Sequence, residues 1–288
     1  MALTNIDNLP LTGWYPAHML TAGKKMREYL KLVDLVVELV DARIPATSTN
    51  PALENLFADK PRCIVLTKAD LADKNTTAAW VKFLSKQGRP AYYIAARNDS
   101  GVHRLVQGIR QAIRSQHASS RSAKSSTFRI MIAGIPNVGK STLVNRLAAK
   151  KKTKVGAVPA VTRGQQWVRL THGIEMLDTP GVLWPTIREK RTELKLGLVG
   201  TIKENVIGPE LLANYLWEWA YRRKHPLDLS RYALEKLPQD PSSLLEAVGA
   251  TRGLLKPGGS IDHHRSAAAF LKDFRQGSLG RITLDPCP

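Results

Sequence analysis

The sequence predicts an α/β fold, with a mostly parallel sheet flanked by helices, followed by a small all-α domain. Short apolar runs alternate with helix-like stretches up to about Trp184, which favours βαβ units on a mostly parallel sheet. After Trp184 the strand signals nearly vanish. Because 288 residues have room for two ordinary domains, we expect one at residues 1–184 and a helical one at residues 185–288.

The apolar runs that have the length and composition of strands are residues 35–42, 63–68, 91–96, 128–134, 166–170 and 174–178. The last two are separated by a short turn and predict an antiparallel hairpin at the edge of the sheet. Helical periodicity fills residues 75–88, 101–116 and 140–151. The Ser-rich, basic stretch His117–Thr127 predicts a flexible linker inside the α/β region.

The C-terminal third has helical periodicity over residues 208–226, 242–254 and 262–277, the last ending at a predicted Gly277 cap. Aromatic residues in the first of these helices could stack on RNA bases. The helix faces favour a core role instead for three of its residues, Leu216, Trp219 and Tyr221. The basic runs Arg222–Lys224 and Lys150–Lys154 are candidates for phosphate contact.

Charge is distributed unevenly along the chain. The net charge is +19, and Ser100 to Ile174 contains 14 Lys and Arg residues but no Asp or Glu. Ordinary solubility is served by mixed signs, so a stretch of one sign favours a polyanionic partner over a merely solvated surface. That stretch has no amphipathic basic helix with a bulky apolar face, which favours nucleic acid over an anionic membrane.

The cysteines and the N-terminus bear on the compartment. The two cysteines, Cys63 and Cys287, match no disulfide framework or metal-ligand spacing, which favours a reducing compartment. The N-terminus lacks the pattern of a signal or transit peptide, and no window approaches 18 consecutive apolar residues. We expect a monomer without a membrane partner, in the cytoplasm or an equivalent organelle matrix.

The segment "GIPNVGKS" follows a predicted strand, opens a predicted helix and satisfies GxxxxGK[ST]. Gly134 and Gly139 would let backbone N–H groups curl around phosphate oxygens. Lys140 would place a positive charge at the β- and γ-phosphates, and Ser141 would offer a hydroxyl to Mg²⁺. A chance match in a glycine-rich loop is the alternative, and the strand before and helix after disfavour it. The sequence therefore predicts a nucleoside triphosphate site.

Two downstream segments fit the same site. "DTPG", Asp178–Gly181, ends the next predicted strand pair, where such a site needs an acid for the magnesium shell and a glycine amide near the γ-phosphate. Between the two, Thr162 in "PAVTR" lies in a loop region able to reach Mg²⁺. Each segment alone is also an ordinary loop sequence. Their position after a phosphate loop favours a role for both in the same nucleotide site.

The segment "TKAD", Thr67–Asp70, follows a predicted strand and resembles a guanine-reading motif. A carboxylate at Asp70 can accept both N1–H and N2–H₂ of guanine, which adenine cannot offer, while the stem of Lys68 lies over the ring. A lone TKAD is more simply a strand-end turn, and this one precedes the phosphate loop. Ligand loops project from the carboxyl ends of parallel strands, so a permuted chain order leaves such a pocket intact. The His117–Thr127 linker would then join the old ends.

With these motifs the chain resembles the circularly permuted GTPases of the ribosome biogenesis GTPase A family. The resemblance covers nearly the whole chain and implies a circularly permuted P-loop GTPase domain followed by a helical domain. It also implies GTP hydrolysis coupled to late maturation of the large ribosomal subunit, with the subunit precursor and its ribosomal RNA as partners. The segments that carry it are "GWYPAHMLTAGKKMREYLKLVDLVVELVDARIPATSTNP", "TKAD", "GIPNVGKSTLVNRL", "PAVTRGQQWVRL", "LDTPGVLWP", "KLGLVGTIK" and "GGSIDHHRSAAAFLKDFRQGSLGRITL".

The resemblance also implies roles for single residues. Guanine would be read by Thr67, Lys68 and Asp70, with the backbone near Ala95 and Ala96 approaching its O6. The phosphates would be cradled by Gly134, Asn137, Val138, Gly139, Lys140, Ser141 and Thr142. Mg²⁺ would meet Ser141 and Thr162, with Asp178 holding its water shell, and hydrolysis would depend on Lys140, Thr162 and Gly181. Asn137 resembles the asparagine that helps bind K⁺ in potassium-stimulated GTPases.

Departures from the usual pattern modify these expectations. Thr67 replaces the commoner Asn, and Ala95-Ala96 lacks the usual serine, which predicts modest guanine affinity. Val182 follows DTPG where many GTPases carry a water-orienting glutamine, so we expect slow intrinsic hydrolysis that a ribosomal partner accelerates. Two other functions remain open: a nucleotide-gated RNA-binding scaffold with incidental hydrolysis, and a GTPase acting on transfer RNA.

Two further pairs of residues are ambiguous. Asp41 and Arg43, in "DARIP", end a predicted strand at the ligand edge of the sheet. Loop fixation and a functional role are equally compatible with that position. His263 and His264 are adjacent, so they face different sides of a helix and make a poor metal pair.

Overall fold

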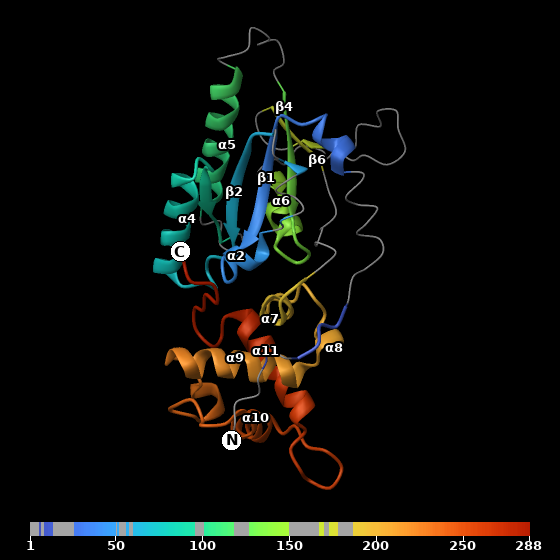
Figure 1. Cartoon of the computed structure of the whole chain (residues 1–288), viewed down its shortest axis with the longest axis vertical. Coiled ribbons are helices and arrows are strands. Elements are labelled where there is room, and N and C mark those ends of the chain that lie inside the picture. The colour runs from blue at the N-terminus through green and yellow to red at the C-terminus, as the bar shows by residue number, and fades with distance from the viewer. Residues whose placement is uncertain are drawn as a thin grey trace. The chain divides into compact units, whose positions relative to one another are not determined.

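The computed structural model describes residues 6, 9–13, 26–49, 51, 56, 57, 60–95, 101–117, 127–149, 167–169, 173–177 and 187–288. The chain forms two compact units (Figure 1). We call Tyr15–Pro185 with Asp285–Pro288 the α/β unit, and Met1–Trp14 with Thr186–Leu284 the helical unit. Among the residues that the structure describes, no helix is long and apolar enough to cross a membrane.

This division differs at both chain ends from the single boundary at residues 184 and 185 expected from the sequence. In the helical unit, Lys190 Nζ donates to Pro10 O at 2.7 Å and Thr12 N donates to Glu193 Oε1 at 2.9 Å. In the α/β unit, Thr47 N donates to Asp285 Oδ2 at 2.7 Å. These hydrogen bonds attach the N-terminal segment to the helical unit, although the residues that follow it along the chain form the α/β unit. They attach the C-terminal residues to the α/β unit, although the residues before them form the helical unit.

The α/β unit is built on a six-stranded sheet of order β3-β2-β1-β4-β6-β5. Every neighbouring pair is parallel except β5 and β6, which are antiparallel and place β5 at the edge. The mostly parallel sheet and its edge hairpin are therefore confirmed. The strands are β1 (Leu35–Asp41), β2 (Arg62–Thr67), β3 (Ala91–Tyr93), β4 (Phe128–Gly134), β5 (Trp167–Arg169) and β6 (Ile174–Leu177).

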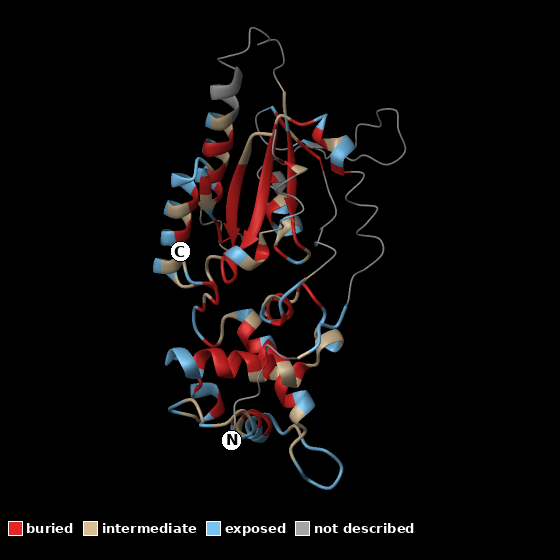
Figure 2. Cartoon of the chain, viewed as in Figure 1, coloured by how far each residue is buried: buried red, intermediate tan, exposed pale blue. Residues whose placement is uncertain are grey.

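The central strands are buried because helices cover the sheet (Figure 2). All seven residues of β1 are buried, as expected of a parallel strand in the middle of a sheet. Trp80 of α4 packs into a core cluster with residues of β1 and β2. Asp73 caps α4 by accepting from Thr76 N at 2.7 Å. The helices of this unit whose bounds fall within the described residues include α2 (Pro45–Ser48), α4 (Lys74–Lys86), α5 (Val102–His117) and α6 (Lys140–Ala149).

The helical unit packs its helices around α9 (Figure 1). The three helices expected from periodicity are present, and Gly277 ends the last of them with a left-handed φ of 82°, as predicted. Two helices and a 3₁₀ turn are additions. The elements are α7 (Lys190–Leu198), α8 (Glu204–Ile207), α9 (Pro209–Arg223), η2 (Ser230–Tyr232), α10 (Pro241–Arg252) and α11 (His263–Gln276).

A buried acid ties three of these elements together. Asp273 of α11 pairs with Arg231 at 2.6 Å, with Arg252 of α10, and with the hydroxyl of Tyr232 in η2. Burial alone would raise the pKa of Asp273, but the hydrogen bonds from Tyr232 and Arg231 outweigh it and lower that pKa. The carboxylate therefore stays charged and is satisfied on every side, which fixes η2, α10 and α11 against one another.

The expected core role is confirmed for Leu216 and Trp219 but wrong for Tyr221. Leu216 and Trp219 are buried, whereas Tyr221 is 45% exposed near the end of α9. Its ring stacks on that of Trp217, one turn earlier, at 5.0 Å and 21°. Trp217 covers one face of the tyrosine ring in place of the core.

Candidate nucleotide-binding site

The predicted site residues lie at one edge of the sheet. Thr67 is the last residue of β2 and pairs in register with Asp41, the last residue of β1. Gly134 ends β4 and pairs with Leu39 of β1. Because these strands are parallel, the loops that follow them leave the sheet on the same side. The base motif and the phosphate loop are thus brought to one edge in spite of their order in the chain.

The phosphate loop has the backbone geometry that its sequence requires. A Cβ atom at Gly134 would lie 2.7 Å from the carbonyl oxygen of Leu39, so only glycine fits at the end of β4. Gly139 has a φ of 109°, and Asn137 has a left-handed φ of 60°, a conformation that asparagine tolerates better than most residues. Helix α6 begins directly afterwards at Lys140. The N–H groups of its first turn and its positive dipole end suit an anion.

The residues predicted to meet the phosphates and Mg²⁺ differ in exposure. Ser141 and Thr142 are exposed in the first turn of α6, Lys140 is half-buried, and Val138 is buried. The hydroxyl of Ser141 is therefore accessible to a cation. Ala96, Thr162, Asp178 and Gly181 lie outside the described residues, so the structure places only Ser141 of the predicted magnesium ligands. Within the described ranges, no cluster of three His, Cys, Asp or Glu residues could hold a metal ion.

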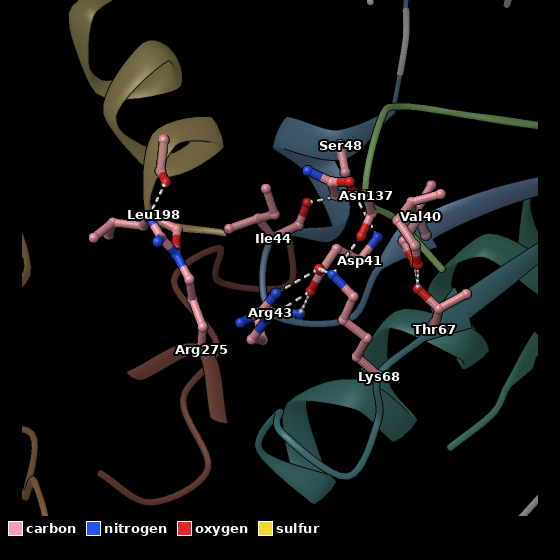
Figure 3. Close-up of polar contacts among 12 residues, drawn as sticks. Val40, Asp41, Arg43, Ile44, Ser48, Thr67, Lys68, Asn137, Leu198 and Arg275 are labelled. Atoms are coloured by element: carbon pink, nitrogen blue, oxygen red, sulfur yellow. Dashed lines mark hydrogen bonds and ion pairs between the residues drawn. The ribbon is translucent and has the colours of Figure 1, made fainter. Parts of the chain in front are cut away.

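The base motif contacts the phosphate loop directly. Thr67 Oγ1 lies 2.6 Å from Val138 O and 3.1 Å from Val40 O, so its hydroxyl donates to the loop from within the sheet. Lys68 Nζ donates to Asn137 O at 2.7 Å, across 69 residues of sequence. Figure 3 shows Thr67 directed at Val40 and Lys68 at Asn137. The two loops therefore support one another.

The rest of the base motif is attached to the end of β3. Ala69 N donates to Ile94 O at 3.1 Å, and Leu71 N donates to Lys68 O at 2.9 Å, which closes a turn around Asp70. Asp70 is partly exposed in that turn, and Ala95, two residues after the end of β3, is buried. Asp70 is therefore accessible to a ligand at the edge where the phosphate loop also opens.

An ion cluster that the sequence left ambiguous lies beside this contact. Asp41, fully buried, accepts from Arg43 Nε at 2.9 Å and Arg43 Nη2 at 2.8 Å, and its Oδ2 lies 2.9 Å from Lys68 Nζ. Burial alone would raise the pKa of Asp41, but Arg43 and Lys68 outweigh it and hold that pKa well below its usual value. The signal available in the sequence was an acid ending a strand that is otherwise apolar except for Glu38.

The chain was compared with known proteins. Residues 129–212 match the model of a family described as 50S ribosome-binding GTPase. Ribosome biogenesis GTPase A of Priestia megaterium is 38% identical over 94% of this chain and 96% of its own length. Mitochondrial ribosome-associated GTPase 1 of Bos taurus is 32% identical over 97% of this chain and 91% of its own. The crystal structure of GNP-bound YlqF from T. maritima superposes with a TM-score of 0.69 at 29% identity, covering 93% of this chain and 98% of that one.

Proposed function

Since this chain belongs to the ribosome biogenesis GTPase A family, we propose that it binds ribosomal RNA and acts in late maturation of the large ribosomal subunit. The chain is a GTPase that hydrolyses GTP to GDP and phosphate. In this proposal GTP orders the loops around Thr162 and Asp178, the protein docks on a large-subunit precursor, and hydrolysis releases it. The observation that carries the nucleotide part of the proposal is the direct contact of the base motif with the phosphate loop, and the ribosomal part rests on similarity to relatives named ribosome biogenesis GTPase A.

Within the nucleotide site we assign guanine recognition to Lys68 and Asp70, with Thr67 of the same motif acting through its contact with the phosphate loop. Mg²⁺ would be held by Ser141 and Thr162, with Asp178 on its water shell, and would neutralise charge on the phosphates. The donor set suits that ion, because hydroxyl and carboxylate oxygens are the ligands Mg²⁺ prefers. Intrinsic hydrolysis is slow in this account, since Val182 cannot orient water, and a ribosomal partner accelerates it.

The end of α9 supports the RNA part of the proposal. Arg223 and Lys224 are exposed there, and the guanidinium of Arg223 lies 5.4 Å from the centroid of the Trp219 ring. Tyr221, exposed beside them, is stacked on Trp217. Exposed cations next to an exposed aromatic ring suit phosphate contact together with base stacking. The 14 cations between Ser100 and Ile174 add a second basic region in the sequence.

The test is sedimentation of the protein with ribosomal particles in cell extract. With a non-hydrolysable GTP analogue, the protein is expected to accumulate on large-subunit precursors, and with GDP it is expected to leave them. Lys140→Ala, which removes the phosphate-loop cation, should fail to accumulate in either condition. Equal association in GTP analogue and GDP would contradict the switch, and it would equally contradict a nucleotide-gated scaffold.

The identity of the bound RNA distinguishes the proposed function from the remaining alternative, a GTPase acting on transfer RNA. Crosslinking the protein in its GTP-analogue state, followed by sequencing of the attached RNA, should enrich large-subunit ribosomal RNA. Enrichment of transfer RNA would favour a GTPase acting on transfer RNA. Fragments scattered over messenger RNAs, without large-subunit enrichment, would overturn the assignment.

A further inference from the structure

We infer that Asp41 is a positioning residue for base recognition, which holds Lys68 in place over the phosphate loop. This inference rests on the proposed nucleotide site, because it gives Asp41 a role through Lys68. The observation behind it is a buried carboxylate at the end of β1 whose Oδ2 lies 2.9 Å from Nζ of the lysine of the base motif (Figure 3). The alternative is an ion pair that only fixes the loop after β1.

The carboxylate of Asp41 is divided between two cations. Its Oδ1 accepts from Arg43 N at 3.1 Å and from Arg43 Nε at 2.9 Å. Its Oδ2 accepts from Arg43 Nη2 at 2.8 Å and lies 2.9 Å from Lys68 Nζ. A buried carboxylate that served the loop alone would be satisfied by the bidentate arginine. The contact with Lys68 adds a second cation, which belongs to the predicted guanine-reading motif.

Lys68 is held from two sides. Its ammonium group has three donors, and it contacts Asp41 Oδ2 at 2.9 Å and Asn137 O at 2.7 Å. Its backbone has a left-handed φ of 55°, an unfavourable conformation for a residue with a side chain. Such a conformation persists when the surrounding structure fixes it, and the two contacts of Nζ contribute to that. The lysine stem is thereby aligned before a nucleotide arrives.

Arg43 has a different part in this arrangement. With Asp41 it forms a pair in which both side chains are almost completely buried. Burying the carboxylate beside only a mobile lysine would be costly, because an unpaired buried charge loses its hydration. Ser48 Oγ accepts from Asp41 N at 2.9 Å and donates to Ile44 O at 2.7 Å, which fixes the backbone on both sides. Arg43 thus braces Asp41, and Asp41 contacts Lys68.

The test is a double-mutant cycle on the affinity for a fluorescent guanosine diphosphate. Asp41→Asn keeps the side-chain shape and removes the charge, so affinity should fall about ten- to a hundredfold, as for loss of a hydrogen bond to a charged group. In a Lys68→Met background the same substitution should change affinity less than about threefold, within the additivity of uncoupled sites. Equal losses in both backgrounds would overturn the inference.

A matched variant comes from the same ion pair. Arg43→Lys keeps a cation beside Asp41 but loses the bidentate geometry, so the melting temperature should fall while affinity stays within about threefold of wild type. If Arg43→Lys lost as much affinity as Asp41→Asn, the pair would be structural only. Should Asp41→Asn fail to fold, Asp41→Glu, which keeps the charge but moves it, carries the same cycle and the same outcomes.

The failure of this inference is distinguishable from failure of the proposed function. Wild-type protein that binds guanosine and adenosine diphosphates equally would contradict the proposed function itself. A wild type that prefers guanosine diphosphate, together with an Asp41→Asn variant of unchanged affinity, would contradict only the role of Asp41.

Discussion

Replacement of Thr67 by valine tests how far the base motif supports the phosphate loop. The hydroxyl of Thr67 lies 2.6 Å from Val138 O and 3.1 Å from Val40 O, and it has one hydrogen to donate. Valine has nearly the same shape and no donor, so a buried carbonyl loses its partner. Such a loss costs about 1–3 kcal/mol in stability.

The same substitution should also weaken nucleotide binding, because Val138 belongs to the loop that holds the phosphates. If about 1–2 kcal/mol of this lost stability belongs to the loop conformation that binds the nucleotide, the affinity for the nucleotide falls about 5- to 30-fold. Urea unfolding followed by circular dichroism measures the first effect, and titration with a fluorescent guanosine diphosphate measures the second. Thr67→Ser keeps the hydroxyl and is the matched control. A Thr67→Val protein with unchanged stability and affinity, or a serine variant equally impaired, would refute the reasoning.

Three further outcomes follow from other parts of the chain. Asp285→Ala removes the acceptor for Thr47 N and Oγ1 and should lower the unfolding free energy by about 1–2 kcal/mol; an unchanged urea midpoint would contradict a structural role for the C-terminal residues. Burial raises the pKa of Cys63 to about 12, so the Cys63 thiol of the native protein should be unreactive at pH 8 until denaturant is added. Rapid labelling of Cys63 in the native state would contradict its burial. If Asn137 helps to bind K⁺, hydrolysis should be faster in potassium than in sodium buffer at equal ionic strength, and equal rates would dismiss that role.

The sheet could be predicted from the sequence because its strands are apolar runs bounded by polar loops. Strand β1 ended one residue before its predicted limit, and β4 had the predicted limits. Helix α7 was missed for a physical reason. Its buried positions include Lys190 and Glu193, which form an ion pair at 2.6 Å. Charged residues therefore occupy positions where a helical pattern normally has apolar residues.

The candidate site was predictable in its motifs but not in its cluster of charges. The residues of the phosphate loop and base motif have spacings that carry their chemistry, and those patterns are local in sequence. The contact of Asp41 with Lys68 depends on β1 lying between β2 and β4, an order that is not written in any single segment. The exposure of Tyr221 likewise depends on a neighbour, Trp217, that takes the place of core packing on one ring face.

The central claim is that a base motif placed before the phosphate loop reads guanine in this chain. Its most direct test is the relative affinity of Asp70→Asn protein for guanosine and xanthosine triphosphates. The amide can no longer accept both guanine donors, so affinity for guanosine triphosphate should fall about ten- to a hundredfold and the preference should turn toward xanthosine triphosphate. An unchanged ratio of the two affinities would contradict the assignment of Asp70 and, with it, the account of a displaced guanine site.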